Sequence, residues 1–232
     1  MEPNKKPSNL RMAKYYLINA LKFYEMKNER ITPVLFVIIL FTGFASTLIS
    51  EKTANDIYLS AMYNIASVFI LYLASVVYLY SYMTELRGGE CSLKQCLGQV
   101  FRKLSKILAA YIAFIAIILT GFFLLIIPGV IFYLMFMFNI CYLLDKDIRV
   151  TDAFNASKNL TARRKMEIFA IFIVFNLTLL LPIFFIIILA SVYGNNLILS
   201  FVVTFLSSIL TLMQQRLIAL LYFDLEYGTK RA

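Results

Sequence analysis

Long apolar runs alternate with short polar segments along this chain. A helix needs roughly 20 apolar residues to cross a hydrocarbon core about 30 Å thick, and six runs stand out as candidates: Ile31–Ser50, Ile57–Met83, Ile107–Ile127, Val130–Leu144, Ile168–Val192 and Leu197–Phe223. The fourth run is short, and on length alone it is either a full span or a re-entrant segment. The pattern predicts an all-α polytopic membrane protein with six transmembrane helices.

The third and fourth runs form one stretch, Ile107–Leu144, which carries no charged side chain and contains Pro128-Gly129 near its middle. A single helix of that length would measure about 57 Å, far more than the bilayer core. Proline interrupts the helical hydrogen-bond ladder, and glycine tolerates a positive φ. We therefore predict two helices joined by a turn at Pro128 and Gly129, on the far side of the membrane or within its outer headgroup layer.

The basic residues set the orientation. They gather before the first run, between the second and third runs, between the fourth and fifth runs, and around the C-terminal end. Of all 22, only Lys52 lies in a segment on the other side. Because basic residues accumulate on the cytoplasmic side, we predict that both termini are cytoplasmic and that the protein lies in a bacterial inner membrane. The whole chain, 1–232, would form one membrane domain, with a cytoplasmic segment 1–30, helices within 31–223 and a cytoplasmic tail 224–232.

Each predicted pair of spans follows an amphipathic stretch with apolar residues at helical spacing. These stretches are Leu10–Arg30, Ser92–Lys106 and Thr151–Phe169. We expect each to form a helix lying at the inner headgroups, with its cations in the phosphate layer. The chain would then consist of three units, each an inner-face helix followed by a two-helix hairpin.

The composition argues against several classes of function. The chain is 61% hydrophobic and has a formal charge of +9, but its cations lie between apolar runs, which argues against nucleic-acid binding. The chain has no histidine, and the odd number of cysteines, with Cys91 and Cys96 in a predicted cytoplasmic loop, does not suggest a disulfide framework. We expect no metal, no cofactor and no enzymatic activity, since no motif typical of a catalytic site occurs.

Polar residues within the runs are few. Asn64, Asn139 and Asn176 either join helices by hydrogen bonds or line a path for a solute. Arg216, near the inner boundary, either snorkels to lipid phosphate or pairs with Asp145 or Glu167. The densest basic cluster, Arg163, Arg164 and Lys165, anchors the topology and is a candidate contact for anionic headgroups, as is Arg216.

Three motifs occur in a characteristic order: LLIIPGVIFYLMFMFNICYLLDKDI, then TDAFNASKNLTARRKMEIF, and LIALLYFDLEYGTKR near the end. In the second, Ala153, Ser157 and Leu160 match an Ala-x-x-x-Ser-x-x-Leu helix, whereas Arg163–Lys165 replace its usual glycine. Together the motifs resemble the bacterial six-span family related to the membrane domain of glycerophosphoryl diester phosphodiesterases. The resemblance implies the six-span architecture, without the separate catalytic barrel that some relatives carry.

These observations lead to one expected function and one alternative. We expect a non-catalytic inner-membrane protein that acts through anionic lipids of the cytoplasmic face or through a membrane-protein partner, in envelope maintenance or as an accessory or immunity subunit of a transporter. The alternative is a small-solute permease or channel, in which Asn64, Asn139 and Asn176 converge.

Overall fold

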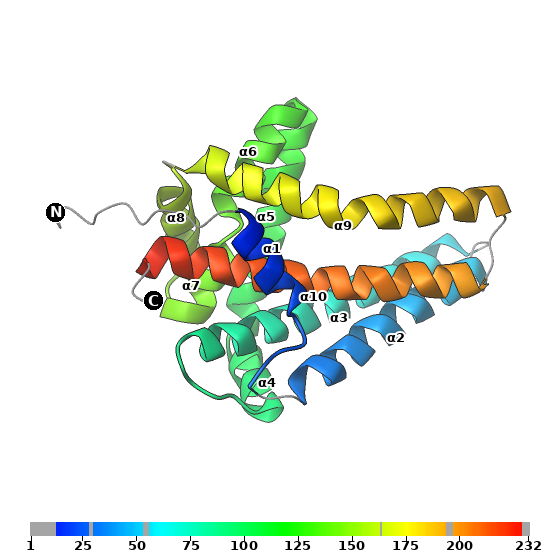
Figure 1. The fold of residues 1–232 in the computed structure, drawn as a ribbon, viewed down its shortest axis with the longest axis horizontal. Helices are drawn as coiled ribbons and strands as arrows, with labels where there is room; N and C mark the ends of the chain where they lie inside the picture. The colour runs from blue at the N-terminus through cyan, green and yellow to red at the C-terminus, as the bar shows by residue number, and fades with distance from the viewer. Residues whose placement is uncertain (1–12, 28–29, 53–55, 163, 194–196, 229–232) are drawn as a thin grey trace, which may run out of the picture. The chain divides into compact units, whose positions relative to one another are not determined.

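The computed structural model describes residues 13–27, 30–52, 56–162, 164–193 and 197–228. In these ranges every regular element is an α-helix (Figure 1). The helices are α1 (Ala13–Leu21), α2 (Ile31–Lys52), α3 (Ile57–Leu86), α4 (Leu93–Arg102), α5 (Leu104–Leu124), α6 (Ile126–Phe136), α7 (Asn139–Lys146), α8 (Val150–Thr161), α9 (Lys165–Tyr193) and α10 (Leu197–Tyr227). The predicted all-α class is confirmed.

The chain divides into two compact units. Unit 1 takes its described residues from 1–19, 97–174 and 217–232, and unit 2 takes them from 20–96 and 175–216. Helices α9 and α10 each contribute residues to both units. That the whole chain acts as one membrane domain stays a prediction.

Five helical segments among the described residues are long and apolar enough to cross a membrane. They are Ile31–Ile49, Tyr58–Leu86, Leu104–Leu124, Ile126–Lys146 and Ile198–Tyr227. These segments are those of a multi-pass membrane protein. The fifth predicted span coincides with α9, whose crossing of a membrane stays a prediction.

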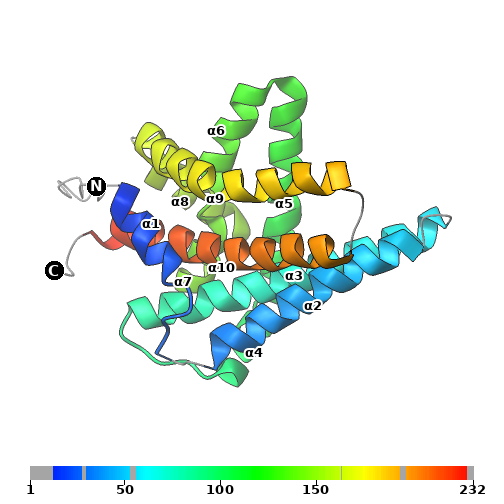
Figure 2. The ribbon, with the colours of Figure 1, turned by 45° about the vertical axis from the view of Figure 1, so that its right-hand side comes forward.

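In unit 1, α5 and α6 form a tight antiparallel hairpin (Figure 2). The predicted turn is present but lies three residues earlier than expected. The chain reverses at Leu125, a single extended residue between the two helices, and Pro128 and Gly129 lie in the first turn of α6. A first-turn proline is tolerated because its missing N–H would have no partner within the helix.

Gly129 therefore has a different role from the predicted one, since it is helical and not at positive φ. It is buried where the two helices cross. A Cβ on Gly121 would lie 2.8 Å from the Gly129 Cα, and a Cβ on Gly129 would lie 2.7 Å from the Phe122 ring. The pair of glycines allows the backbones to approach closely, as small residues do in membrane helix pairs.

The predicted fourth helix is broken in two, between α6 and α7. Ser157, from α8, supplies hydrogen bonds at the break: its Oγ donates to the Met135 carbonyl at 2.7 Å and accepts from the Phe138 N–H at 3.3 Å. Ser157 is fully buried. A side chain from another helix thus replaces backbone bonds that the break removes.

In unit 2, α2 and α3 form the second hairpin, and the N-terminal part of α10 packs on α2. Asp56 caps α3 by accepting a hydrogen bond from the Leu59 N–H at 3.1 Å. Edge-to-face aromatic pairs, Phe36–Phe205 and Phe44–Phe201, join α2 to α10 with ring centroids 5.4 Å apart.

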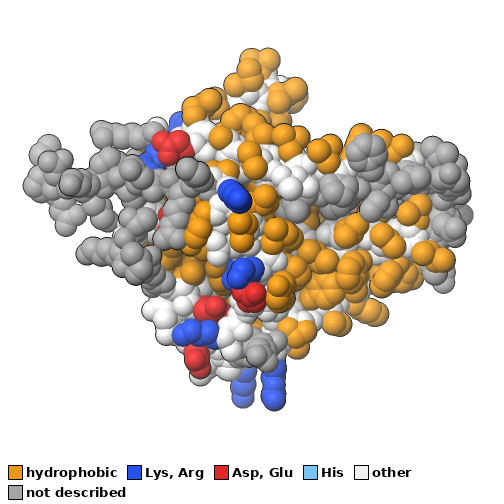
Figure 3. Space-filling model, in the orientation of Figure 1, with side chains coloured by type: hydrophobic (Ala, Val, Ile, Leu, Met, Phe, Trp, Pro, Cys, Tyr) orange, Lys and Arg blue, Asp and Glu red, His pale blue; other side chains and the backbone are white. Residues whose placement is uncertain are grey.

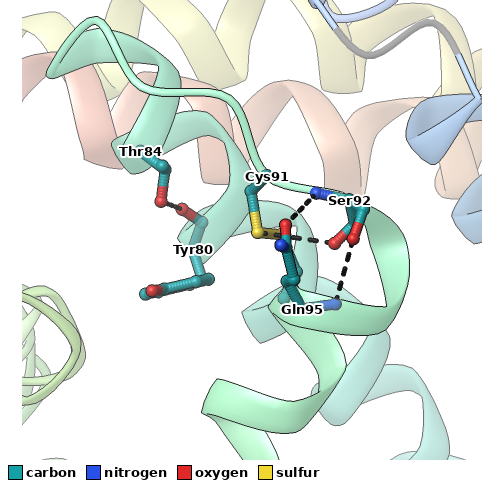
Figure 4. The surroundings of a disulfide bond; sticks show 6 residues. Tyr80, Thr84, Cys91, Ser92 and Gln95 are labelled. Carbon is teal, nitrogen blue, oxygen red and sulfur yellow. Dashed lines mark hydrogen bonds between the residues drawn. A yellow bond between two sulfur atoms is a disulfide. The ribbon is translucent and has the colours of Figure 1, made fainter.

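The segment before α4 departs from the expectation for cysteine. Cys91 and Cys96 form a disulfide (Figure 4), which the odd cysteine count did not suggest. Cys141 is free and buried. Beside the disulfide lies a capping box, because the Gln95 N–H donates to Ser92 Oγ and the Ser92 N–H donates to Gln95 Oε1. The capping box fixes the start of α4.

Each predicted amphipathic stretch contains a helix: α1, α4 and α8. Helix α2 contacts α3, and α5 contacts α6. The predicted arrangement of the membrane spans as hairpins stays a prediction, as do the hairpin between α9 and α10 and the threefold arrangement.

Candidate functional site

The predicted headgroup-binding cations that the structure describes in the basic cluster 163–165, Arg164 and Lys165, are both partly buried. Arg163 lies outside the described residues. Arg164 keeps only 14% of its side chain exposed and lies 4.0 Å from Glu167, and Lys165 is half-buried at the start of α9. In unit 1 the described cations that are exposed are instead Lys14, Arg102, Lys146, Arg149 and Lys158, and of these Lys146 pairs with Glu226. Arg102, Arg149 and Lys158 are more exposed than Arg164 and Lys165.

Arg216 is 6% exposed in unit 2, and its contact with a lipid headgroup stays a prediction. Its guanidinium donates to the Glu25 carbonyl at 2.8 Å and lies 4.3 Å from the centre of the Tyr82 ring. Neither contact is one of the carboxylate pairings expected from the sequence. Nearby, the Tyr78 hydroxyl donates to the Phe23 carbonyl at 2.7 Å. Together these bonds fasten the segment after α1 to α3 and α10.

Unit 1 contains a tyrosine–carboxylate cluster, which we define as Asp145, Glu226, Tyr142, Tyr222 and Tyr227. Asp145 accepts hydrogen bonds from the Tyr222 hydroxyl at 2.6 Å and from the Tyr227 hydroxyl. Glu226 accepts from the Tyr142 hydroxyl at 2.6 Å and pairs with Lys146. Tyr142 and Tyr222 stack edge to face at 5.1 Å. The cluster joins the end of α7 to the end of α10.

Sequence reasoning missed this cluster, although a signal was present. Both predicted helices end with carboxylates preceded by tyrosines, in YLLD and YFDLEY. A tyrosine near a membrane boundary needs a partner for its hydroxyl when the ring is buried. A fourth such bond runs from the Tyr16 hydroxyl of α1 to Asp224, at 2.7 Å.

Two lysines form hydrogen bonds at the C-terminal end of α7. Lys103, buried between α4 and α5, donates to the Leu143 and Leu144 carbonyls at 3.0 and 3.2 Å, and so satisfies the helix C-terminus. Lys106 donates to Asp147 at 2.9 Å. That hydrogen bond, with the charge of Lys103 in second place, holds the pKa of Asp147 below its usual value.

The three amides are not shown to converge. Asn64 accepts from Ser46 Oγ at 3.2 Å and so joins α3 to α2. Asn139 is 2% exposed, and its side-chain nitrogen has no hydrogen-bond partner among the described residues. Asn64 and Asn176 belong to unit 2 and Asn139 to unit 1, so a common path stays a prediction.

The tyrosine–carboxylate cluster is held together mainly by hydrogen bonds between side chains. The described residues include no group of three histidines, cysteines, aspartates or glutamates that could hold a metal ion. Comparison with known proteins adds no assignment, since no family model, no curated protein and no solved structure matches the chain. The resemblance to the membrane domain of the phosphodiesterases therefore stays a prediction.

Proposed function

We propose that this chain is a six-span protein of a bacterial inner membrane, with both termini cytoplasmic, that acts through lipid or protein partners and not by catalysis. One observation carries the proposal. The carboxylates at the ends of α7 and α10 accept hydrogen bonds from tyrosines or pair with lysine, while large apolar side chains on the candidate spans face outward. A scaffold of this kind offers its surroundings an apolar surface bordered by exposed cations.

Anionic lipid is the partner that the exposed cations favour. Each basic residue near an anionic surface contributes about 1 kcal/mol of attraction. Arg102, Arg149 and Lys158 would therefore hold headgroups more strongly than the half-buried Arg164 and Lys165.

Native mass spectrometry of protein extracted with its surrounding membrane tests this proposal. We expect retained phosphatidylglycerol or cardiolipin that is lost when Arg102, Arg149 and Lys158 are changed to Gln. Arg164→Gln with Lys165→Gln is the matched control and should retain the lipid. A stoichiometric second polypeptide would favour the accessory or immunity role. A bare chain, with neither lipid nor protein, would contradict both.

The permease is a second candidate because the side-chain nitrogen of the buried Asn139 lacks a hydrogen-bond partner among the described residues. A polar group in a solute path exchanges its partners, whereas a packing amide keeps one. If the chain conducts a solute, Asn139→Leu should abolish flux into liposomes, and Asn64→Leu, which removes the bond to Ser46, should mainly lower stability. Liposomes that take up none of a panel of small solutes would rule against this candidate.

A further inference from the structure

The tip of the α5–α6 hairpin is a continuous apolar surface. Six consecutive residues, from Phe122 to Ile127, are all large, apolar and exposed. Their exposed fractions range from 46% for Phe122 to 92% for Phe123. Hydrophobic side chains, in orange, cover the tip of the α5–α6 hairpin at the top of Figure 3. An exposed apolar patch of this kind marks a contact with a membrane or a partner.

The positions of the charged residues indicate that this apolar surface contacts the membrane. The hairpin has its cations only at its base, where Lys103 and Lys106 precede α5 or lie in its first turn, and Lys146 ends α7. At 1.5 Å per residue, the tip lies about 28 Å along the helix from Lys106 and at most about 31 Å from Lys146. Both distances are close to the hydrocarbon thickness of about 30 Å, and any tilt shortens the depth reached.

The turn pairs part of its backbone within the chain. A hydrocarbon phase requires nearly every backbone N–H and C=O to be paired within the protein. Only Leu125 separates the two helices, and its N–H donates to the Gly121 carbonyl at 3.1 Å. The Gly129 N–H donates to the Leu125 carbonyl at 3.3 Å. Pro128 has no N–H, which removes one of the donors that a helix N-terminus leaves unpaired.

We propose that residues 122–127 remain in the hydrocarbon of the outer leaflet, with lipid acyl chains as their partner. The hairpin would then anchor in both leaflets without presenting a loop to the outside. This inference rests on the proposed orientation, with the base of the hairpin cytoplasmic. The glycine contact between Gly121 and Gly129 keeps the tip narrow, which limits the number of displaced acyl chains.

Cysteine labelling tests the position of the tip. In a background of Cys91→Ser, Cys96→Ser and Cys141→Ala, single cysteines replace Phe123 and Leu125. Control cysteines replace Asp56, at the exposed start of α3, and Lys94, exposed on α4. Each variant is treated with a membrane-impermeant maleimide, applied to intact cells, to inside-out vesicles and to protein denatured in detergent.

We expect Phe123→Cys and Leu125→Cys to lose labelling from both sides and to regain it after denaturation. Asp56→Cys should be labelled on intact cells, and Lys94→Cys in inside-out vesicles. Labelling of Leu125→Cys on intact cells, to the extent seen for Asp56→Cys, would overturn the buried tip. If the two controls are labelled on the same side or with sides reversed, the proposed topology is wrong, which separates its failure from that of the tip.

A second readout reports depth directly. A fluorophore attached at Leu125→Cys, in liposomes, should be quenched by lipids brominated on their acyl chains and unaffected by aqueous iodide. Quenching by iodide alone would place the tip in water and overturn the proposal.

Discussion

At the residue scale, two glycines of similar appearance in the sequence have different surroundings. Gly121 faces the Gly129 backbone, whereas Gly98, on α4, has no atom within 4 Å of the place where a Cβ would be. Backbone cannot move aside as a flexible side chain can. An added methyl group should therefore destabilise the protein at Gly121 but not at Gly98.

Gly121→Ala should lower the free energy of unfolding by about 1–3 kcal/mol, the usual cost of overpacking. Gly98→Ala should leave it unchanged or raise it by up to about 1 kcal/mol, because alanine is the better helix former. Cys141 is buried and free, so its reaction with a fluorogenic thiol reagent during heating measures unfolding in a background of Cys91→Ser and Cys96→Ser. Equal melting temperatures for the two variants would contradict the close contact.

The pH dependence of stability tests the contribution of the Asp147 ion pair. Because the pKa of Asp147 is lowered in the folded protein, its ion pair stabilises the fold above the ordinary carboxyl pKa, and this contribution is lost as the pH falls through the lowered pKa. Asparagine tolerates the left-handed backbone at this position, where φ is 48°. Asp147→Asn should therefore melt at a lower temperature than the parent at neutral pH and at the same temperature in acid. A difference that persists unchanged in acid would show that the charge is not responsible.

At the scale of elements, the junctions depend on side chains that come from elsewhere in the chain. Ser157 completes the break between α6 and α7, Lys103 closes the end of α7, and Arg216 holds the segment after α1. Each of these side chains is buried. If one is lost, its backbone partners are left without a hydrogen bond, because water does not reach them. Such losses cost more than the bonds themselves contribute.

Ser157→Ala should lower the free energy of unfolding by about 1–3 kcal/mol, since the Met135 carbonyl and the Phe138 N–H lose a partner within a buried region. Asn155→Ala, at an exposed position on the same helix, is the matched control and should change little. The thiol-reaction assay at Cys141 measures both. Equal stability of the two variants would mean that the break is held by other contacts.

Arg216→Gln should release the segment around Glu25 while leaving the helices intact. Loss of the bond to the Glu25 carbonyl and of the contact with Tyr82 removes its attachment, the ring contact contributing about 0.5–2 kcal/mol. Limited trypsin digestion of detergent-solubilised protein should then cut faster at Lys22 and Lys27. Lys94→Gln, an exposed change of the same charge, serves as the control, and an unchanged cleavage rate in Arg216→Gln would contradict the attachment.

At the scale of the whole molecule, the apolar runs were sufficient to predict where helices form, because length and hydropathy are local properties. They could not place the turn, since Pro-Gly suits a reverse turn and the first turn of a helix equally. They could not reveal the break in the fourth helix, because Ser157 acts from another element. The tyrosine–carboxylate cluster joins residues about 80 positions apart, which periodicity does not detect.

The oxidation state of Cys91 and Cys96 in cells tests the proposed orientation in the membrane. A cytoplasmic loop is kept reduced, whereas disulfides persist in oxidising compartments. In cells quenched with acid and then alkylated, we expect both cysteines to be found as alkylated thiols, with the disulfide forming when purified protein is treated with oxidised glutathione. Cys141, which is buried, should react only after denaturation and serves as the internal control. Complete oxidation within cells would place this loop outside and reverse the proposed topology.

The uncharged tip of the α5–α6 hairpin also bears on how the chain enters the membrane during synthesis. The loop between α2 and α3 must carry Glu51, Lys52 and Asp56 through the bilayer under the proposed topology. Each charge of this kind costs roughly 2.5–3.5 kcal/mol at the centre of a membrane helix. From Ile107 to Leu144 there is no such charge. We therefore expect this hairpin to reach its final depth without moving a charged side chain across the bilayer.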